Sequence, residues 1–171
     1  MRTFVVFVTM LFTISLADAN QQTMLRVQLQ QLTLESATLT DVEKVDRIQA
    51  LSTLINLQDE KQTKLVQSPE QLFQSGYGNE AELAFAKWQM LSDLGLPKEQ
   101  FRLVYVQDKK DLSRQVWLAW YTADKIKLIT SSDVFDRTKT VKRIQSEVDV
   151  LSVLNPELVL SNRSHTRSSN T

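Results

Sequence analysis

The chain has 171 residues, 42% of them hydrophobic and 23% charged, which suits one domain of ordinary size with a packed core. Lysine and arginine balance aspartate and glutamate at 20 each, so the charge gives no case for nucleic acid or an anionic membrane surface as a partner. The absence of cysteine excludes disulfides and thiol chemistry within these residues.

The first 19 residues have the order of a secretory signal peptide. Arg2 supplies a positive charge, residues 4–16 form an apolar run, and Ala17-Asp18-Ala19 fits the small-x-small cleavage rule. The run is too short to span a bilayer comfortably, and an uncleaved membrane anchor is the alternative. We therefore expect a periplasmic or secreted chain, with no integral membrane segment once residues 1–19 are removed.

Helices are predicted in the first part of the remaining chain. Residues 20–36 place leucines at helical spacing. Thr40 and Glu43 form a capping box that opens a second helix. Ser68 and Pro69 are suited to the cap and first position of a third, short helix. These helices are most simply scaffold.

A central helix follows the glycine turn Gly76-Tyr77-Gly78. Asn79 is its predicted cap, with Glu82 at the third helical position. The segment is apolar on much of its surface, so we expect the helix to be buried. Gly95 and the proline at position 97 end it.

Beyond residue 97 the hydrophobic pattern alternates, which predicts strands at residues 101–107, 114–121 and 126–130. The turns between them are short, so the strands should be antiparallel neighbours. Trp117 and Trp120 should lie on opposite faces, with one in the core and the other partly exposed. The exposed tryptophan is expected to pack ordinarily, and lining a peptide groove is the alternative.

The end of the chain is less clearly patterned. Residues 141–154 fit a helix by the spacing of their apolar residues, whereas residues 148–154 (VDVLSVL) also fit a strand. The final residues are polar and serine-rich, which indicates a disordered tail. We therefore expect a signal peptide at residues 1–19, one α+β domain at residues 20–160 and a tail at residues 161–171.

Several blocks of the sequence resemble, in order, the bacterial transglutaminase-like cysteine proteinases. Residues 78–82 (GNEAE) and 84–88 (AFAKW) resemble the family's Gly-Asp-Cys-Glu-Asp and Ala-Ile-Ala-Lys-Tyr. Residues 94–97 (LGLP) and 102–106 (RLVYV) continue the match, and the resemblance favours a strand at residues 148–154. The family includes exported periplasmic proteases that clip surface adhesins. The resemblance implies a papain/transglutaminase-like fold, with N-terminal helices and a central helix packed on a mostly antiparallel sheet.

The resemblance also implies where a catalytic triad would stand. The nucleophile position is Glu80, the base position is Gln115 and the position of the orienting aspartate is Thr130. The alignment can shift by one residue at Gln115 or Thr130 without restoring the triad. The chain's single histidine, His165, lies in the predicted tail. We therefore expect Glu80, Gln115 and Thr130 to lie together as a degenerate triad.

Calcium binding in the adhesin-clipping branch of the family uses acidic residues beside the cysteine. Their counterparts here are Asn79 and Ala81, so the resemblance implies a degenerate calcium site. Glu80 and Glu82 remain, but two carboxylates in one helical turn are expected to serve capping and the helix dipole. We expect neither a metal nor another cofactor.

The expected function is that of a non-catalytic family member, a pseudoenzyme that retains the fold as a module for binding a protein or an extended peptide. The alternative is a hydrolase with an unrecognised carboxylate mechanism centred on Glu80. A carboxylate at a helix N-terminus is stabilised as the anion, which makes it a poor proton donor. A purely structural role is the third possibility.

Overall fold

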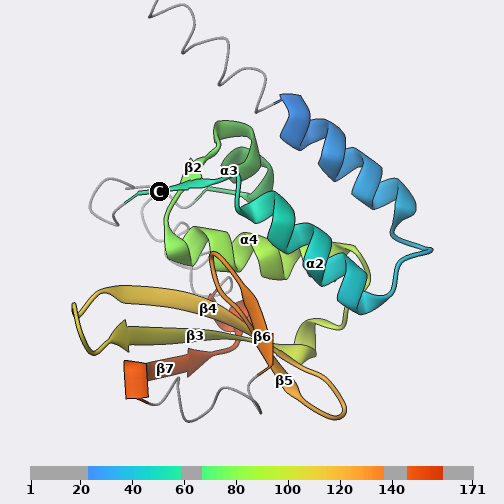
Figure 1. The fold of residues 1–171 in the computed structure, drawn as a ribbon. Helices are drawn as coiled ribbons and strands as arrows, with labels where there is room; N and C mark the ends of the chain where they lie inside the picture. Colours follow the sequence, from blue (N-terminus) through green and yellow to red (C-terminus); the bar gives the residue numbers. More distant parts are fainter. Residues whose placement is uncertain (1–22, 59–66, 137–145, 160–171) are drawn as a thin grey trace, which may run out of the picture.

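The computed structural model describes residues 23–58, 67–136 and 146–159 (Figure 1). The predicted signal peptide and the predicted tail lie outside the described residues. Among the residues that are described, no helix is long and apolar enough to cross a membrane.

Most helices come first along the chain, and the strands of the main sheet follow them. A helix over residues 23–35 precedes α2 (Asp41–Ser52), α3 (Pro69–Ser75), α4 (Glu80–Asp93) and a 3-10 turn, η2 (Lys98–Gln100). Two short strands, β1 (Asn56–Leu57) and β2 (Tyr77–Gly78), pair in parallel. The remaining strands are β3 (Phe101–Asp108), β4 (Arg114–Tyr121), β5 (Ile126–Ile129), β6 (Val134–Asp136) and β7 (Val148–Leu154).

These last five strands form an antiparallel sheet in the order β6-β5-β4-β3-β7. The helices gather on one face of this sheet, and α4 lies directly against it (Figure 1). The predicted α+β class, with helices packed on an antiparallel sheet, is therefore confirmed. Residues 148–154 form a strand, which settles their ambiguous pattern. The three-residue strand β6 was not predicted.

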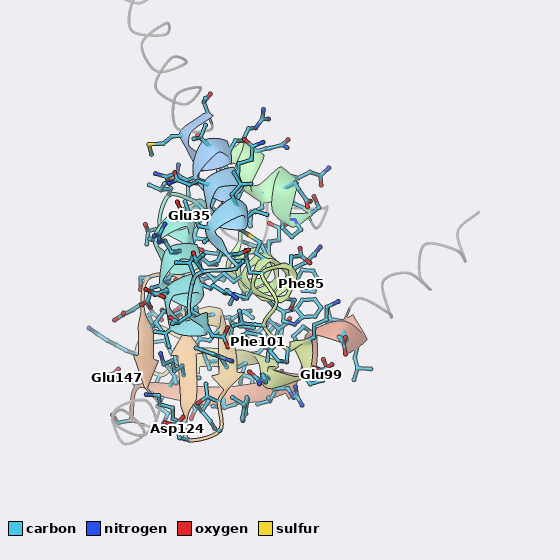
Figure 2. All side chains as sticks on the ribbon, turned by 90° about the vertical axis from the view of Figure 1, so that its right-hand side faces the viewer. Glu35, Phe85, Glu99, Phe101, Asp124 and Glu147 are labelled. Carbon is cyan, nitrogen blue, oxygen red and sulfur yellow. The ribbon has the colours of Figure 1, made fainter. Side chains whose placement is uncertain are left out.

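The sheet is apolar on both faces. In β4, Val116, Leu118 and Trp120 belong to the main core beneath the helices, whereas Trp117 and Ala119 belong to a second cluster on the opposite face. The two tryptophans do lie on opposite faces, but both are buried, at 6% and 3% exposure. The prediction that one would be partly exposed is wrong, because Trp120 is buried in the main core and Trp117 is buried in the second cluster. Figure 2 shows the boundary between the layers, with Phe85 of α4 above Phe101 of β3.

The three predicted helix caps are present at Thr40, Ser68 and Asn79, and in the structure each of them forms a capping box. The turn before α4 needs its two glycines for different reasons. Gly76 has a positive φ of 73°, which disfavours other residues. At Gly78, a Cβ atom would stand 2.1 Å from Cδ1 of Leu72. The start of α4 is therefore fixed against the buried face of α3.

Candidate functional site

The first turn of α4 carries two glutamates in different roles. Asn79 Oδ1 accepts a hydrogen bond from the Glu82 amide at 2.8 Å. The Glu82 carboxylate is buried and accepts from the amides of Asn79 and Gln67, each at 3.1 Å. Glu82 thus holds the entry to the helix, as expected. Glu80 takes no part in this capping arrangement and remains partly exposed.

The Glu80 carboxylate faces the loop that follows β5. Burial raises the pKa of Glu80, and a hydrogen bond from the Ser131 hydroxyl and the charge of Lys87 oppose that shift. The sequence led us to expect a helix terminus that favours the Glu80 anion, whereas desolvation shifts the pKa of this carboxyl in the opposite direction. A raised pKa leaves Glu80 better suited to proton transfer than the sequence indicated.

Lys87 is a buried charge that the sequence analysis did not single out. Its side chain is 1% exposed. Its ammonium group donates to Gln49 Oε1 of α2 at 2.8 Å and to the carbonyl oxygen of Thr130 at 2.5 Å. Gln49 in turn donates to the carbonyl oxygen of Ser131 at 3.3 Å. Together with Glu80, these residues form a polar group that we call the Lys87 cluster.

Burial lowers the pKa of Lys87 to about 8, and the negative charge of Glu80 opposes this shift. Two titratable groups with perturbed pKa values thus lie two turns apart on α4. Such pairs are common at functional sites, although structural ion-pair networks also contain them. A sequence signal existed, because Lys87 is the one charged residue between Glu82 and Asp93 in a mostly apolar helix.

The backbone carbonyl group of Thr130, not its side chain, contacts Lys87. Its side chain is buried and organises the turn that follows, accepting from the amides of Ser132 and Asp133 at 3.3 and 3.0 Å. Its hydroxyl also donates to the Asp133 carbonyl oxygen at 3.1 Å. The Thr130 hydroxyl is therefore engaged in the turn rather than directed at Glu80.

The fold does not bring the Gln115 side chain close to Glu80 or Thr130. Its side-chain oxygen accepts from the Trp117 indole at 2.9 Å, and Trp117 lies on the sheet face that points away from the helices. Residues of equal parity in a strand share a face, so Gln115 also points away from α4. The predicted gathering of three side chains thus fails for Gln115. The identification of these positions with a former triad stays a prediction.

Next to Gln115 in β4, Val116 faces the helices. The pairing of β4 with β5 includes Leu118 opposite Ile129. Continued by two residues, that antiparallel register brings Val116 level with Ser131, the partner of Glu80. Val116 is buried in the main core. If the alignment with the family is shifted by one residue, the predicted base position therefore falls on the apolar side chain of Val116.

The predicted degenerate calcium positions serve the helix start and the core. Asn79 caps α4, and Ala81 packs against the main core. Within the described residues, no group of three or more histidine, cysteine, aspartate or glutamate side chains is arranged to hold a metal ion.

Comparison with known proteins gives a likeness of fold. No family model matches the chain, and no curated protein matches it. The fold is similar to that of Legionella pneumophila LapG. A LapG structure superposes with a TM-score of 0.62 at 14% identity, covering 81% of this chain and 82% of LapG. The EGTA-treated form gives the same TM-score and identity and covers 81% of each chain. Calcium-bound LapG gives a TM-score of 0.54 at 16% identity, covering 81% of this chain and 72% of LapG.

This likeness corrects one expectation from the sequence. The chain shares its fold with LapG, and a likeness of fold gives no ground for classing the chain as a non-enzyme, so that prediction is wrong. The missing cysteine excludes a thiol nucleophile within these 171 residues and no other chemistry. At 14% identity the likeness shows the fold alone.

Proposed function

We propose that the chain is exported and binds an extended polypeptide at the start of α4. The contact surface would comprise Glu80, the neighbouring Tyr77 and the turn at Ser131 and Ser132. The observation that carries the proposal is the partly exposed Glu80 carboxylate, held by the Ser131 hydroxyl in a fold similar to that of LapG. The resemblance of the sequence to proteinases that clip surface adhesins supports a polypeptide as the ligand here.

The chemistry of this surface fits a polypeptide backbone or a basic side chain. A carboxylate accepts hydrogen bonds from amide N–H groups and from cations, and such charge-assisted bonds are stronger than neutral ones. Tyr77 is 37% exposed and lies three residues before Glu80. Its ring would add an apolar element to the proposed contact surface. Two turns further along α4, the hydrogen bonds of Lys87 tie the middle of this helix to α2 and to the turn after β5.

Export is the second part of the proposal. It is supported by the predicted signal peptide at residues 1–19 and by the resemblance of the sequence to a family with exported members.

A hydrolase centred on Glu80 is the second candidate, and the perturbed pKa values of Glu80 and Lys87 favour it. In this reaction the Glu80 carboxylate takes a proton from a water that attacks the peptide carbonyl carbon. Protonated Glu80 then passes that proton to the departing amine as the carbon–nitrogen bond breaks. Lys87 would act through its charge on Glu80, because its ammonium group is buried and bonded to Gln49 and Thr130.

One probe tests both candidates. Reduced, carboxymethylated α-lactalbumin, labelled with fluorescein, stays unfolded and presents extended polypeptide. Anisotropy reports binding, and the release of new amino groups reports cleavage. Binding by the wild-type chain should weaken about fivefold in Glu80→Gln, the equivalent of one hydrogen bond of about 1 kcal/mol. The matched control is Glu99→Gln, on the exposed turn before β3 (Figure 2).

The outcomes separate the candidates. Binding that depends on Glu80 without cleavage supports the binding module. Cleavage that Glu80→Gln abolishes and Glu99→Gln preserves establishes the hydrolase. Equal binding by the wild-type chain and Glu80→Gln, without cleavage, contradicts both.

A further inference from the structure

A pocket opens in the helical layer at the other end of α4. It has a volume of about 210 Å³ and is lined from the helix over residues 23–35 and from α2, α3 and α4. Figure 1 shows the helix over residues 23–35 on the side of this layer away from the sheet. The pocket contains Met90, Asp93 and Leu94 of α4, whereas Glu80 begins that helix. Ten residues of helix separate Glu80 from Met90 by about 15 Å. The pocket is therefore distinct from the site at Glu80.

The interior of the pocket is apolar. Ile48 and Phe73, each 1% exposed, belong to the main core, and Leu29, Met90 and Leu94 are partly exposed around them. Pockets for small-molecule ligands and cofactors are usually larger, at about 300–1,000 Å³. A volume of about 210 Å³ suits a single apolar side chain.

The remaining lining includes two carboxylates. Glu70 at the start of α3 and Asp93 at the end of α4 are both exposed. Glu70 accepts a hydrogen bond from the Ser68 hydroxyl at 2.8 Å. Neither carboxylate forms an ion pair with the described residues, and no described lysine or arginine lines the pocket. An apolar group with a positive charge nearby would complement both the apolar interior and the two carboxylates of this lining.

We propose that this pocket is a docking site for a leucine-sized side chain of a partner polypeptide, flanked in that partner by lysine or arginine. The apolar side chain enters between Leu29, Phe73 and Met90. The flanking cations face Glu70 and Asp93. Burial of the side chain supplies the attraction, and the two carboxylates select basic over acidic neighbours. The proposal does not depend on the function of the site at Glu80.

The proposed docking site can be tested with three short peptides, whose binding is followed by the NMR signal of the Met90 methyl group. The probes are N-acetyl, C-amidated Lys-Leu-Lys, Glu-Leu-Glu and Lys-Ser-Lys. The chain has four methionines, and Met90 lines the pocket while Met24 does not. In a chain carrying 13C-methyl methionine, Lys-Leu-Lys should shift the Met90 methyl signal saturably and leave that of Met24 in place. Glu-Leu-Glu and Lys-Ser-Lys should bind at least fivefold more weakly.

Two variants separate charge from shape. Glu70→Gln/Asp93→Asn keeps the shape and should weaken Lys-Leu-Lys about fivefold, while its affinity for Glu-Leu-Glu rises. Thr33→Phe places a ring at an exposed lining position and should abolish the Met90 response to Lys-Leu-Lys. Unchanged methyl spectra away from the pocket will show that both variants fold.

Three results would overturn the proposal. The first is an absent Met90 response to Lys-Leu-Lys at the solubility limit. The second is an equal response to Lys-Ser-Lys, which would mean that the peptide is bound through its charges alone and that the leucine side chain contributes nothing. The third is a Met90 signal that broadens with protein concentration before any probe is added, which would mean that a second copy of the chain occupies the pocket.

Discussion

The ammonium group of Lys87 donates to the carbonyl oxygen of Thr130, 43 residues further along the chain, and both residues are buried. This hydrogen bond joins the middle of α4 to the turn after β5. The bond from Lys87 to Gln49 joins the same point to α2. A single buried charge thus connects the helical layer to the sheet beside Glu80.

Lys87 and Gln49 should be energetically coupled. Either Lys87→Met or Gln49→Leu removes one hydrogen-bond partner from a buried polar group, which typically costs about 1–3 kcal/mol. The double variant removes both groups, so it should cost less than the sum of the two single changes. Urea unfolding of all four proteins should give a coupling energy of about 1–2 kcal/mol. Strict additivity would show that their hydrogen bond adds nothing to stability.

The stability of the chain should rise with pH in the alkaline range. The pKa of Lys87 falls from 10.5 to about 8 on folding, so between these values the unfolded chain binds the proton more tightly. The free energy of unfolding should therefore increase from pH 8 to pH 10.5, by up to roughly 3 kcal/mol.

Urea unfolding at pH 7.5, 8.5 and 9.5 measures this rise. Lys87→Met should lack it. Lys98→Met, which changes an exposed lysine in η2, should keep it. The same rise in Lys87→Met and the wild-type chain would assign it to other groups.

The pKa of Lys87 should respond to the charge of Glu80. The Glu80 carboxylate raises the pKa of Lys87 and so opposes the effect of burial. In Glu80→Gln that opposition is lost, and the pKa of Lys87 should fall below about 8. Titration of the Lys87 side-chain methylene signals by NMR measures this shift directly, with Glu99→Gln as the control. An unchanged or higher pKa in Glu80→Gln would show that the two charges do not interact.

Gly78→Ala and Gly76→Ala should both destabilise the turn before α4, for different reasons. An added Cβ at Gly78 meets Cδ1 of Leu72, which is fully buried, so overpacking should cost about 1–3 kcal/mol. At Gly76 there is space for a Cβ, so the loss of stability comes from the positive φ, which costs an alanine about 1–2 kcal/mol. Replacing Leu72 by alanine should relieve part of the cost at Gly78 and none at Gly76. Thermal unfolding of the single and double variants tests this; equal relief at both would contradict it.

The helix starts were predictable because their determinants are local. At Thr40, Ser68 and Asn79, the cap and the residue that completes the capping box lie three positions apart. The alternating pattern likewise predicted β3, β4 and β5. The strand β6 has only three residues, too few for the pattern to be distinguished from a turn.

The geometry of the site was less predictable, for two physical reasons. The burial of Lys87 depends on partners 38 and 43 residues away, which no local pattern reveals. The orientation of Gln115 depends on which face of β4 meets the helices. Both faces of that strand are apolar, so the alternation of its residues carries no such information.

The most direct test of the proposed function is to locate the bound polypeptide. In a 15N–1H titration of the labelled chain with unlabelled carboxymethylated α-lactalbumin, the largest amide shifts should fall at residues 77–82 and 131–133, and Glu80→Gln should reduce them. Saturable binding that leaves these amides unchanged and shifts others, such as those of residues 29–33 and 90–94 around the pocket, would contradict a polypeptide site at the start of α4.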